Sequence, residues 1–241
     1  MLDRAAELIK KSNHIVVLTG AGISTDSGLP DYRSNGGLWD GKKPEEISHF
    51  SAVGKPEFVK FFADRMNDIS NCKPNKAHEI LAKWEEQGKV KSVITQNIDS
   101  YHKDAGSKNV IEMHGHLRNL VCDTCSKEYD NSMYTKEDKD NCGLEWECTG
   151  VVRPEVVLFG ETLPPLAWHQ ANEQMKKTDL VIVLGTSLQV FPFNSLVESV
   201  YPGKAPVMII TKSDTPYDHM ASVRIYDNIT ETLVEIDNRL K

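Results

Sequence analysis

The chain has 241 residues, enough for one large domain or for a domain that carries a smaller insert. Apolar residues make up 39% of it and charged residues 26%, which excludes a disordered chain and allows a full core. The 28 basic and 35 acidic residues give a net charge of −7, which argues against nonspecific or direct nucleic-acid binding. This charge mildly favours a cationic partner, but a charge that only keeps the protein soluble explains it more simply.

The sequence also bears on location. It has no apolar run of about 18 residues, and its amino terminus, 1–4, lacks the apolar stretch of a signal peptide. We therefore expect a cytoplasmic protein without a membrane partner. Four of the five cysteines lie between positions 122 and 148, which favours a metal site in a reducing compartment over a framework of disulfides.

Helices and strands are expected to alternate along most of the chain. The predicted helices have apolar residues three or four positions apart, at 2–9, 56–69, 75–87, 167–177 and 229–240. The predicted strands are short apolar runs, at 15–18, 90–95, 110–113, 156–159, 180–184, 207–210 and 223–225. This alternation predicts an α/β fold with a Rossmann-like parallel sheet and helices on both of its faces.

The region 117–150 interrupts the alternation. It is polar, it has no long apolar period and it holds the clustered cysteines, so we predict a small inserted metal-binding module there. The larger Rossmann-like domain would then consist of 1–33, 90–116 and 151–241. The remaining segment, 34–89, would supply helices of the small domain and a cofactor loop. Its first residues, 34–39, are either a loop that closes over a ligand or an ordinary surface loop.

Four predicted strands end in polar or glycine-rich sequences, at 20–33, 95–99, 114–115 and 185–187. Ligands of doubly wound sheets bind beyond the carboxyl ends of the strands, so these sequences are expected to meet at one edge. Gly20 and Gly22 would let a phosphate approach backbone N–H groups. Thr25 replaces the third glycine of a dinucleotide fingerprint, so a tight turn without a ligand also fits this segment taken alone.

The side chains at these ends suit a nucleotide, because amides, carboxylates and hydroxyls bond to ribose, carboxamide and phosphate groups. His114 has an ordinary pKa near ~6.5, which suits a general base, although a lone histidine at a strand end is often structural. The other candidates are Asp31, Tyr32, Arg33, Gln96, Asn97, Asp99, Thr186 and Ser187.

Together, these segments resemble the successive signatures of the sirtuins, the NAD-dependent protein lysine deacylases. The order and spacing match from about residue 15 to the final helix, as in a minimal bacterial-type catalytic core, and Thr-Gln-Asn-Ile-Asp at 95–99 is the most specific part. The matching segments are 20–24, 28–33, 95–99, 114–115, 153–154, 159–161 and 185–187.

The resemblance implies a reaction with NAD as co-substrate. An acetylated or otherwise acylated lysine peptide would enter between the large and small domains, and its acyl oxygen would attack C1′ of the nicotinamide ribose. Nicotinamide would leave, His114 would act as base on the ribose hydroxyls, and Asn97 would hold the ribose and order water. The products would be nicotinamide, O-acyl-ADP-ribose and free lysine.

The resemblance also implies binding roles. Ile98 and Asp99 would bind the carboxamide, and Arg33 with Tyr32 would position and cover the ribose. The peptide would be held as an added strand. The implied substrate contacts are Val157, Phe159, Gly160, Glu161, Gln189, Val190 and Phe191. The implied NAD contacts are Gly20, Ala21, Gly22, Ser24, Thr25, Asp31, Tyr32, Arg33, Gln96, Asn97, Ile98, Asp99, His114, Gly185, Thr186, Ser187, Thr211 and Ile229.

The cysteines resemble the family's structural zinc site. Four thiolates would hold one Zn²⁺ in a tetrahedron and staple a module that has little core of its own. In this sequence Glu145 stands where the third cysteine belongs, and a cysteine comes three residues earlier, so an incomplete site is the alternative. The expected ligands are Cys122, Cys125, Cys142 and Cys148.

Other departures concern substrate and adenosine. Tyr32 replaces the family's usual phenylalanine, and Thr211 stands where an asparagine is usual. Members that prefer acidic acyl groups carry a Tyr-x-x-Arg pair, matched here by Phe62 and Arg65, so Arg65 is a candidate carboxylate reader. Without the tyrosine, the resemblance favours deacetylation. The alternatives are a desuccinylase, a mono-ADP-ribosyltransferase, or a silent NAD-sensing or zinc-stabilised binding module.

Overall fold

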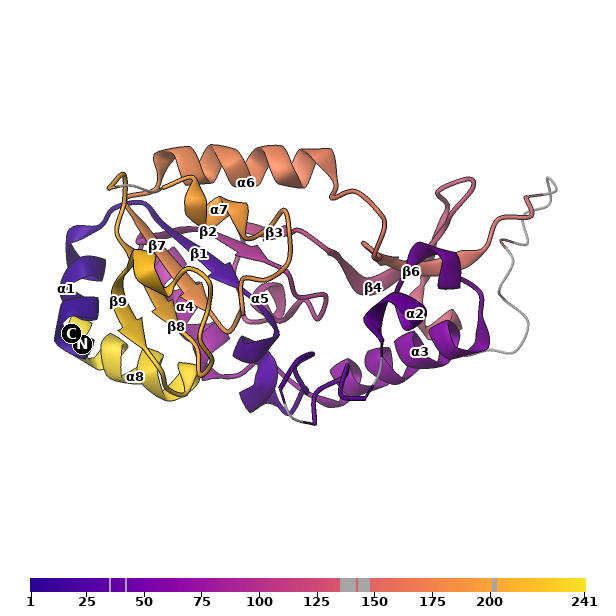
Figure 1. The fold of residues 1–241 in the computed structure, drawn as a ribbon, viewed down its shortest axis with the longest axis horizontal. Coiled ribbons are helices and arrows are strands. Elements are labelled where there is room, and N and C mark those ends of the chain that lie inside the picture. Colours follow the sequence, from indigo (N-terminus) through magenta and orange to yellow (C-terminus); the bar gives the residue numbers. More distant parts are fainter. Residues whose placement is uncertain (35, 42, 135–141, 143–147, 201–202) are drawn as a thin grey trace.

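A six-stranded parallel sheet forms the larger part of the molecule (Figure 1). The structure is a computed structural model that describes residues 1–241 except 35, 42, 135–141, 143–147 and 201–202. The strand order is β3-β2-β1-β7-β8-β9, so successive strands spread in opposite directions from β1. The strands are β1 (Ile15–Thr19), β2 (Val90–Thr95), β3 (Val110–Glu112), β7 (Leu180–Leu184), β8 (Val207–Ile210) and β9 (Ala221–Ile225).

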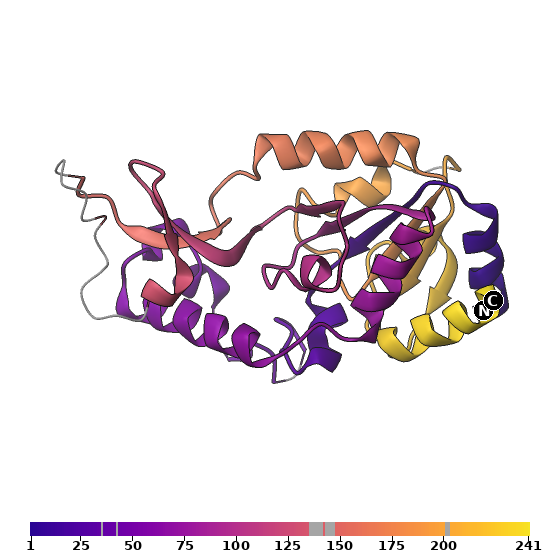
Figure 2. The ribbon, with the colours of Figure 1, turned by 180° about the vertical axis from the view of Figure 1, so that it is seen from behind.

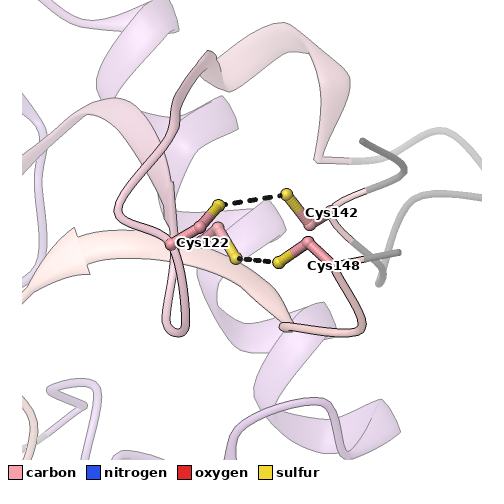
Figure 3. Close-up of side chains that lie close together, drawn as sticks. Cys122, Cys142 and Cys148 are labelled. Carbon is pink, nitrogen blue, oxygen red and sulfur yellow. Dashed lines mark hydrogen bonds between the residues drawn. The ribbon is translucent and has the colours of Figure 1, made fainter. Parts of the chain in front are cut away.

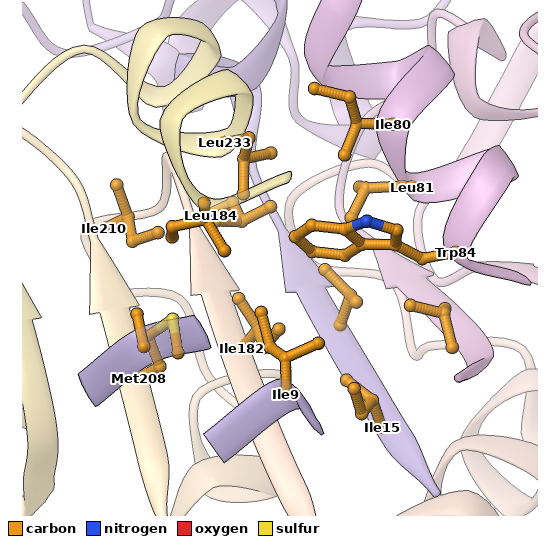
Figure 4. Packing of buried hydrophobic residues seen from close by; sticks show 14 of the residues in the cluster. Ile9, Ile15, Ile80, Leu81, Trp84, Ile182, Leu184, Met208, Ile210 and Leu233 are labelled. Carbon is orange, nitrogen blue, oxygen red and sulfur yellow. The ribbon is translucent and has the colours of Figure 1, made fainter. Parts of the chain in front are cut away.

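Helices cover both faces of this sheet, which confirms the predicted fold class (Figures 1 and 2). One face carries α1 (Leu2–Lys11), α4 (Lys76–Glu86) and α8 (Ile229–Leu240), and the other carries α6 (Pro165–Lys177) and α7 (Ser195–Glu198). Figure 4 shows Trp84 of α4 packed over the sheet beside Leu81 and Leu184. The two termini lie next to each other, near α1 and α8.

Sequence signals explain where the helices begin. The Asn75 side chain accepts a hydrogen bond from the Ala77 backbone N–H at 2.9 Å, which caps α4 as such a residue should. Asn228 caps α8 in the same way, with Glu231 N–H as donor at 3.0 Å. The helix predicted at 56–69 is α3 (Pro56–Asn71), which starts with proline at a position that tolerates it.

A second, antiparallel sheet lies beside the first and has the order β5-β4-β6. Its strands are β4 (Gly115–Cys122), β5 (Glu128–Asp130) and β6 (Val152–Val156), and α3 packs against it through Phe58 and Phe62. The predicted division of the chain into a large domain and two inserts stays a prediction. The remaining short helices are α2 (Pro44–Ile47), α5 (Tyr101–Asp104) and the 3-10 turns at 21–27, 50–52, 131–133 and 218–220.

One predicted strand was displaced. The apolar run 156–159 was expected to be extended, but β6 ends at Val156 and the run then leaves the sheet. Val157 N–H donates to the His114 carbonyl at 2.9 Å, and Phe159 N–H donates to the Ser48 carbonyl at 2.9 Å. Contacts with two distant segments therefore decide the path of this run, and neither is visible in its own sequence. In the described part of the chain, every helix is too short or too polar to cross a bilayer.

Candidate active site

A cavity of about 1060 Å³ lies beyond the carboxyl ends of the parallel strands. It reaches from the loops after β1, β7, β8 and β9 to the segment that follows β6, so it extends between the two sheets. Nearly all the expected NAD contacts line it: Gly20, Ala21, Gly22, Thr25, Asp31, Tyr32, Arg33, Gln96, Asn97, Ile98, His114, Gly185, Thr186, Ser187, Thr211 and Ile229. The expected substrate contacts line it too: Val157, Phe159, Gly160, Glu161, Gln189, Val190 and Phe191.

The loops after β1 and β7 touch each other at the point where the strand order reverses. Gly22 N–H donates to the Gly185 carbonyl at 2.9 Å. A Cβ on Gly22 would lie 2.8 Å from Gly185 Cα, and Gly185 itself has a φ of +60°, so both positions require glycine. This close backbone contact forms the floor of the cavity, where open α/β sheets place their ligands.

Ser24 and Asp99 lie behind the cavity wall and do not line it. Ser24 Oγ donates to Asp99 Oδ2 at 2.7 Å, and the Tyr101 backbone N–H donates to Asp99 Oδ1 at 3.0 Å. Burial raises the pKa of Asp99, and these two donors oppose that rise. The Asn97 side chain donates to the Gly20 carbonyl at 3.2 Å, so the network ties the loop after β2 to the loop after β1.

His114 follows β3 at the junction of the two sheets. Its Nδ1 lies 3.2 Å from the Gln96 carbonyl oxygen, which can only accept, so Nδ1 carries the proton of the neutral ring. Nε2 is then the basic nitrogen. Burial lowers the pKa of His114 to about 4, which keeps the ring neutral near pH 7. The Gln96 side chain in turn donates to Thr186 Oγ1 at 2.8 Å and links β2 to β7.

The loop that carries Asp31 is held by a turn and by stacked rings. Asp31 Oδ1 accepts from the backbone N–H groups of Arg33 and Ser34, at 3.0 and 2.8 Å. The Tyr32 ring lies 5.2 Å from that of Trp39, which stacks on Phe61 at 5.1 Å. The three rings and Ser34 lie along the cavity wall, and a closing role for this loop stays a prediction.

Arg65 on α3 does not line the cavity. Its side chain is 4% exposed, and its Nε and Nη1 are without hydrogen-bond partners among the described residues. The guanidinium lies 5.8 Å from the centre of the ring of Tyr32, which lines the cavity. The structure therefore brings Arg65 next to a residue of the cavity wall but leaves it out of the lining.

The far end of the cavity is built from the segments expected to hold a peptide. Glu161 forms an ion pair with Arg153 at 2.8 Å and accepts from the Leu158 backbone N–H at 2.9 Å, so it fixes the turn after β6. Phe159 and Phe191 are 37% and 80% exposed, although both are large and apolar. Exposed apolar side chains at a cavity mouth are typical of a surface that binds another molecule.

Sequence reasoning missed part of the cavity wall. The loop after β8 contributes Lys212 to Asp214, and the loop after β9 contributes Asp227 and Asn228. Both loops follow strands that had been predicted, so the strand-end rule applied to all six parallel strands would have found them.

The four expected cysteine ligands meet at the end of β4, and their Sγ atoms all lie within 4.8 Å of one another (Figure 3). The Sγ atoms of Cys122 and Cys148 are 3.7 Å apart, and those of Cys125 and Cys142 are 3.4 Å apart. Zn–S bonds of about 2.3 Å in a tetrahedron separate the sulfurs by about 3.8 Å, so the cluster fits Zn²⁺ with no position left for substrate. Glu145, the departure from the family pattern, lies outside the described residues.

Comparisons with known proteins agree with this geometry. The model of the Sir2 family matches residues 20–192. The chain is 41% identical over 234 residues to an NAD-dependent protein deacetylase of Oceanobacillus iheyensis, covering 95% of this chain and 97% of that protein. It is 42% identical over 233 residues to NAD-dependent protein deacetylase 1 of Geobacillus kaustophilus, covering 95% and 94%.

Solved structures lead to the same family. A Sir2 homologue in complex with NAD is 34% identical, with a TM-score of 0.89, and the match covers 99% of this chain and 95% of that one. A Sir2 mutant with a deacetylated p53 peptide and 3′-O-acetyl-ADP-ribose is 33% identical, with a TM-score of 0.91 and coverage of 98% and 97%. The chain belongs to the Sir2 family, the sirtuins.

Proposed function

We propose that this chain is an NAD-dependent protein lysine deacetylase. The observation that carries the proposal is that His114 and Asn97 line one cavity that runs from the glycine contact of β1 and β7 to the exposed Phe159 and Phe191. One end of the cavity suits a dinucleotide and the other suits an extended peptide. His114 and Asn97 would therefore lie between the two substrates. The proposed reaction, NAD-dependent deacetylation, is the one for which the relatives described above are named.

NAD, as co-substrate, supplies the electrophilic C1′ carbon from which nicotinamide leaves. The chain's own residues then act at defined atoms. His114 Nε2 is neutral and free to take a proton from a ribose hydroxyl, because Nδ1 is committed to the Gln96 carbonyl. Asn97, fixed to the Gly20 carbonyl, is placed to hold the ribose beside it. Asp99 keeps this loop in place through Ser24.

The decisive experiment is mass spectrometry of an acetyl-lysine peptide incubated with the protein, with and without NAD. We expect the peptide to lose its acetyl group only when NAD is present, with nicotinamide and O-acetyl-ADP-ribose formed in equal amounts. Transfer of labelled ADP-ribose from NAD to protein, without deacetylation, would instead favour the mono-ADP-ribosyltransferase. Loss of acetyl without NAD would contradict both functions.

The acyl preference rests on Arg65. Its buried guanidinium has free donors near the cavity, which favours a second candidate, a desuccinylase. However, Arg65 does not line the cavity, and Phe62, which does, offers no hydroxyl. We therefore expect a higher kcat/KM for acetyl-lysine than for succinyl-lysine peptides of the same sequence. Equal or faster succinyl turnover would contradict this preference.

We also propose that the four cysteines bind one structural Zn²⁺, supported by the sulfur geometry described above. Acylated proteins are the proposed partners, because a site that binds backbone as an added strand accepts many sequences. A cytoplasmic location and the lack of direct nucleic-acid binding stay predictions.

A further inference from the structure

Two histidines lie against each other beneath the site, and the mechanism above does not use them. His78 on α4 is 0% exposed and His102 on α5 is 1% exposed, and their ring centres are 4.8 Å apart. Each ring has one buried nitrogen without a partner among the described residues: Nε2 of His78 and Nδ1 of His102. Two unpaired polar atoms on adjacent buried rings need a common explanation.

The proton on His78 can be placed from its neighbours. His78 Nδ1 lies 3.2 Å from the Asn75 backbone N–H, which can only donate, and 3.1 Å from Asn75 Oδ1, which can only accept. Oδ1 already accepts from the Ala77 backbone N–H, whereas the Asn75 N–H has no other acceptor among the described residues. Nδ1 therefore accepts, and in the neutral ring the proton sits on Nε2. The unpaired atom of His78 is thus a donor. Burial lowers the pKa of His78 to about 4, which agrees with a neutral ring.

The proton on His102 follows from a chain of hydroxyls. Thr19 Oγ1 donates to Thr95 Oγ1 at 2.8 Å, so its proton is used. His102 Nε2, 3.0 Å from Thr19 Oγ1, must then donate, which leaves Nδ1 as a bare acceptor. If His102 carried its proton on Nδ1 instead, this N–H would face the N–H of His78. Two buried donors would then lack an acceptor, which costs free energy.

We propose that His78 Nε2–H donates to His102 Nδ1, directly or through one water, and that the resulting chain of hydrogen bonds positions the catalytic histidine. The chain runs from His78 through His102 and Thr19 to Thr95. These are positioning residues, because none of the four lines the cavity.

The last link reaches the site through the backbone after β2. Thr95 Oγ1 accepts from the Asn97 backbone N–H at 3.0 Å and from Thr19. Gln96 lies between Thr95 and Asn97 in the sequence, and its carbonyl oxygen orients His114 by accepting from Nδ1. A shift of this peptide would move the base and Asn97 together, and small displacements of catalytic groups are costly. This inference rests on the proposed function.

The first test reads the protons directly and needs no activity. Long-range ¹H–¹⁵N spectra of protein labelled at histidine distinguish the two neutral tautomers, and single His78→Asn and His102→Asn variants assign the signals. We expect both rings to carry the proton on Nε2. A His102 ring protonated on Nδ1 would overturn the proposal.

The second test uses deacetylation kinetics. Thr19→Val keeps the side-chain shape but removes the hydroxyl, so kcat should fall about tenfold with the peptide KM unchanged. Thr19→Ser restores the hydroxyl and should recover most of this loss, even though it leaves a small cavity. Thr178→Val is the matched control, because it removes a buried hydroxyl that bonds to the His14 carbonyl, away from the site.

The outcomes separate the inference from the function. A wild-type kcat in Thr19→Val, or a Thr19→Ser variant as slow as Thr19→Val, would overturn the positioning role. A comparable fall in Thr178→Val would show that lost stability explains the effect and would also overturn it. If the wild-type protein had no NAD-dependent turnover, the proposed function would fail, while the spectra would still decide the histidine pair.

Discussion

In the six-stranded sheet, β1 and β7 are buried at every position, whereas β4 and β6 of the three-stranded sheet combine buried residues with partly exposed ones. The central strands of the large sheet are covered by helices on both faces, so apolar burial alone can stabilise it. The small sheet has α3 on one side and a shorter apolar cluster that includes cysteines. We therefore expect the small sheet to need the metal cross-link for its stability, and the site between the two sheets to need both sheets folded.

The largest expected effect is on the cross-linked sheet. Cys148→Ser removes one of four thiolates, and structural zinc contributes on the order of 10 kcal/mol to the folding of small domains. We expect loss of zinc, local unfolding around β4 to β6, and loss of turnover, with the helix signal of the large domain retained in circular dichroism. Cys72→Ser, outside the cluster, is the control and should keep zinc and turnover. If Cys148→Ser lost zinc but kept normal turnover, the small sheet would not need the cross-link, and the contrast with the large sheet would be wrong.

The next effect separates chemistry from stability. His114→Ala removes the proposed base, and loss of a general base lowers rates by about 10²- to 10⁴-fold. Since the His114 ring contributes one hydrogen bond at the cavity wall, the urea midpoint should change little. Steady-state kinetics and urea unfolding measure the two quantities, with His116→Ala as a neighbouring control that does not line the cavity. Retained turnover in His114→Ala would contradict the assignment of the base.

A smaller effect is expected in how stability depends on pH, because His78 is buried in the large domain. The pKa of His78 is lowered from 6.5 to about 4 by burial. Between these values the unfolded chain binds more protons, so stability from this group is full above pH 6.5 and is lost as pH falls. His78→Asn should therefore lose about 2 kcal/mol less than the wild type between pH 7 and 5, measured by urea unfolding. Identical slopes would be inconsistent with a buried neutral ring, and His169→Asn removes an exposed histidine as the control.

The sequence predicted the large sheet well because its signals are local. The runs 90–95 and 180–184 are strands with the predicted bounds, since β-branched residues flanked by polar turns have few alternatives. The caps at Asn75 and Asn228 also depend on neighbouring residues alone. The small sheet was predicted only as a module, because its strands pair across distant parts of the chain and have mixed burial.

The sequence by itself determined which groups gather at the carboxyl edge of the sheet, the cysteine set, and the family. Residue types and spacing are enough for this, because a parallel sheet sends every strand end to one edge. The tertiary structure decided the rest: that Arg65 lies against Tyr32 and outside the cavity lining, that β6 ends at Val156, and that His78 meets His102. These facts depend on how helices pack against strands far away in the chain, which no local pattern encodes.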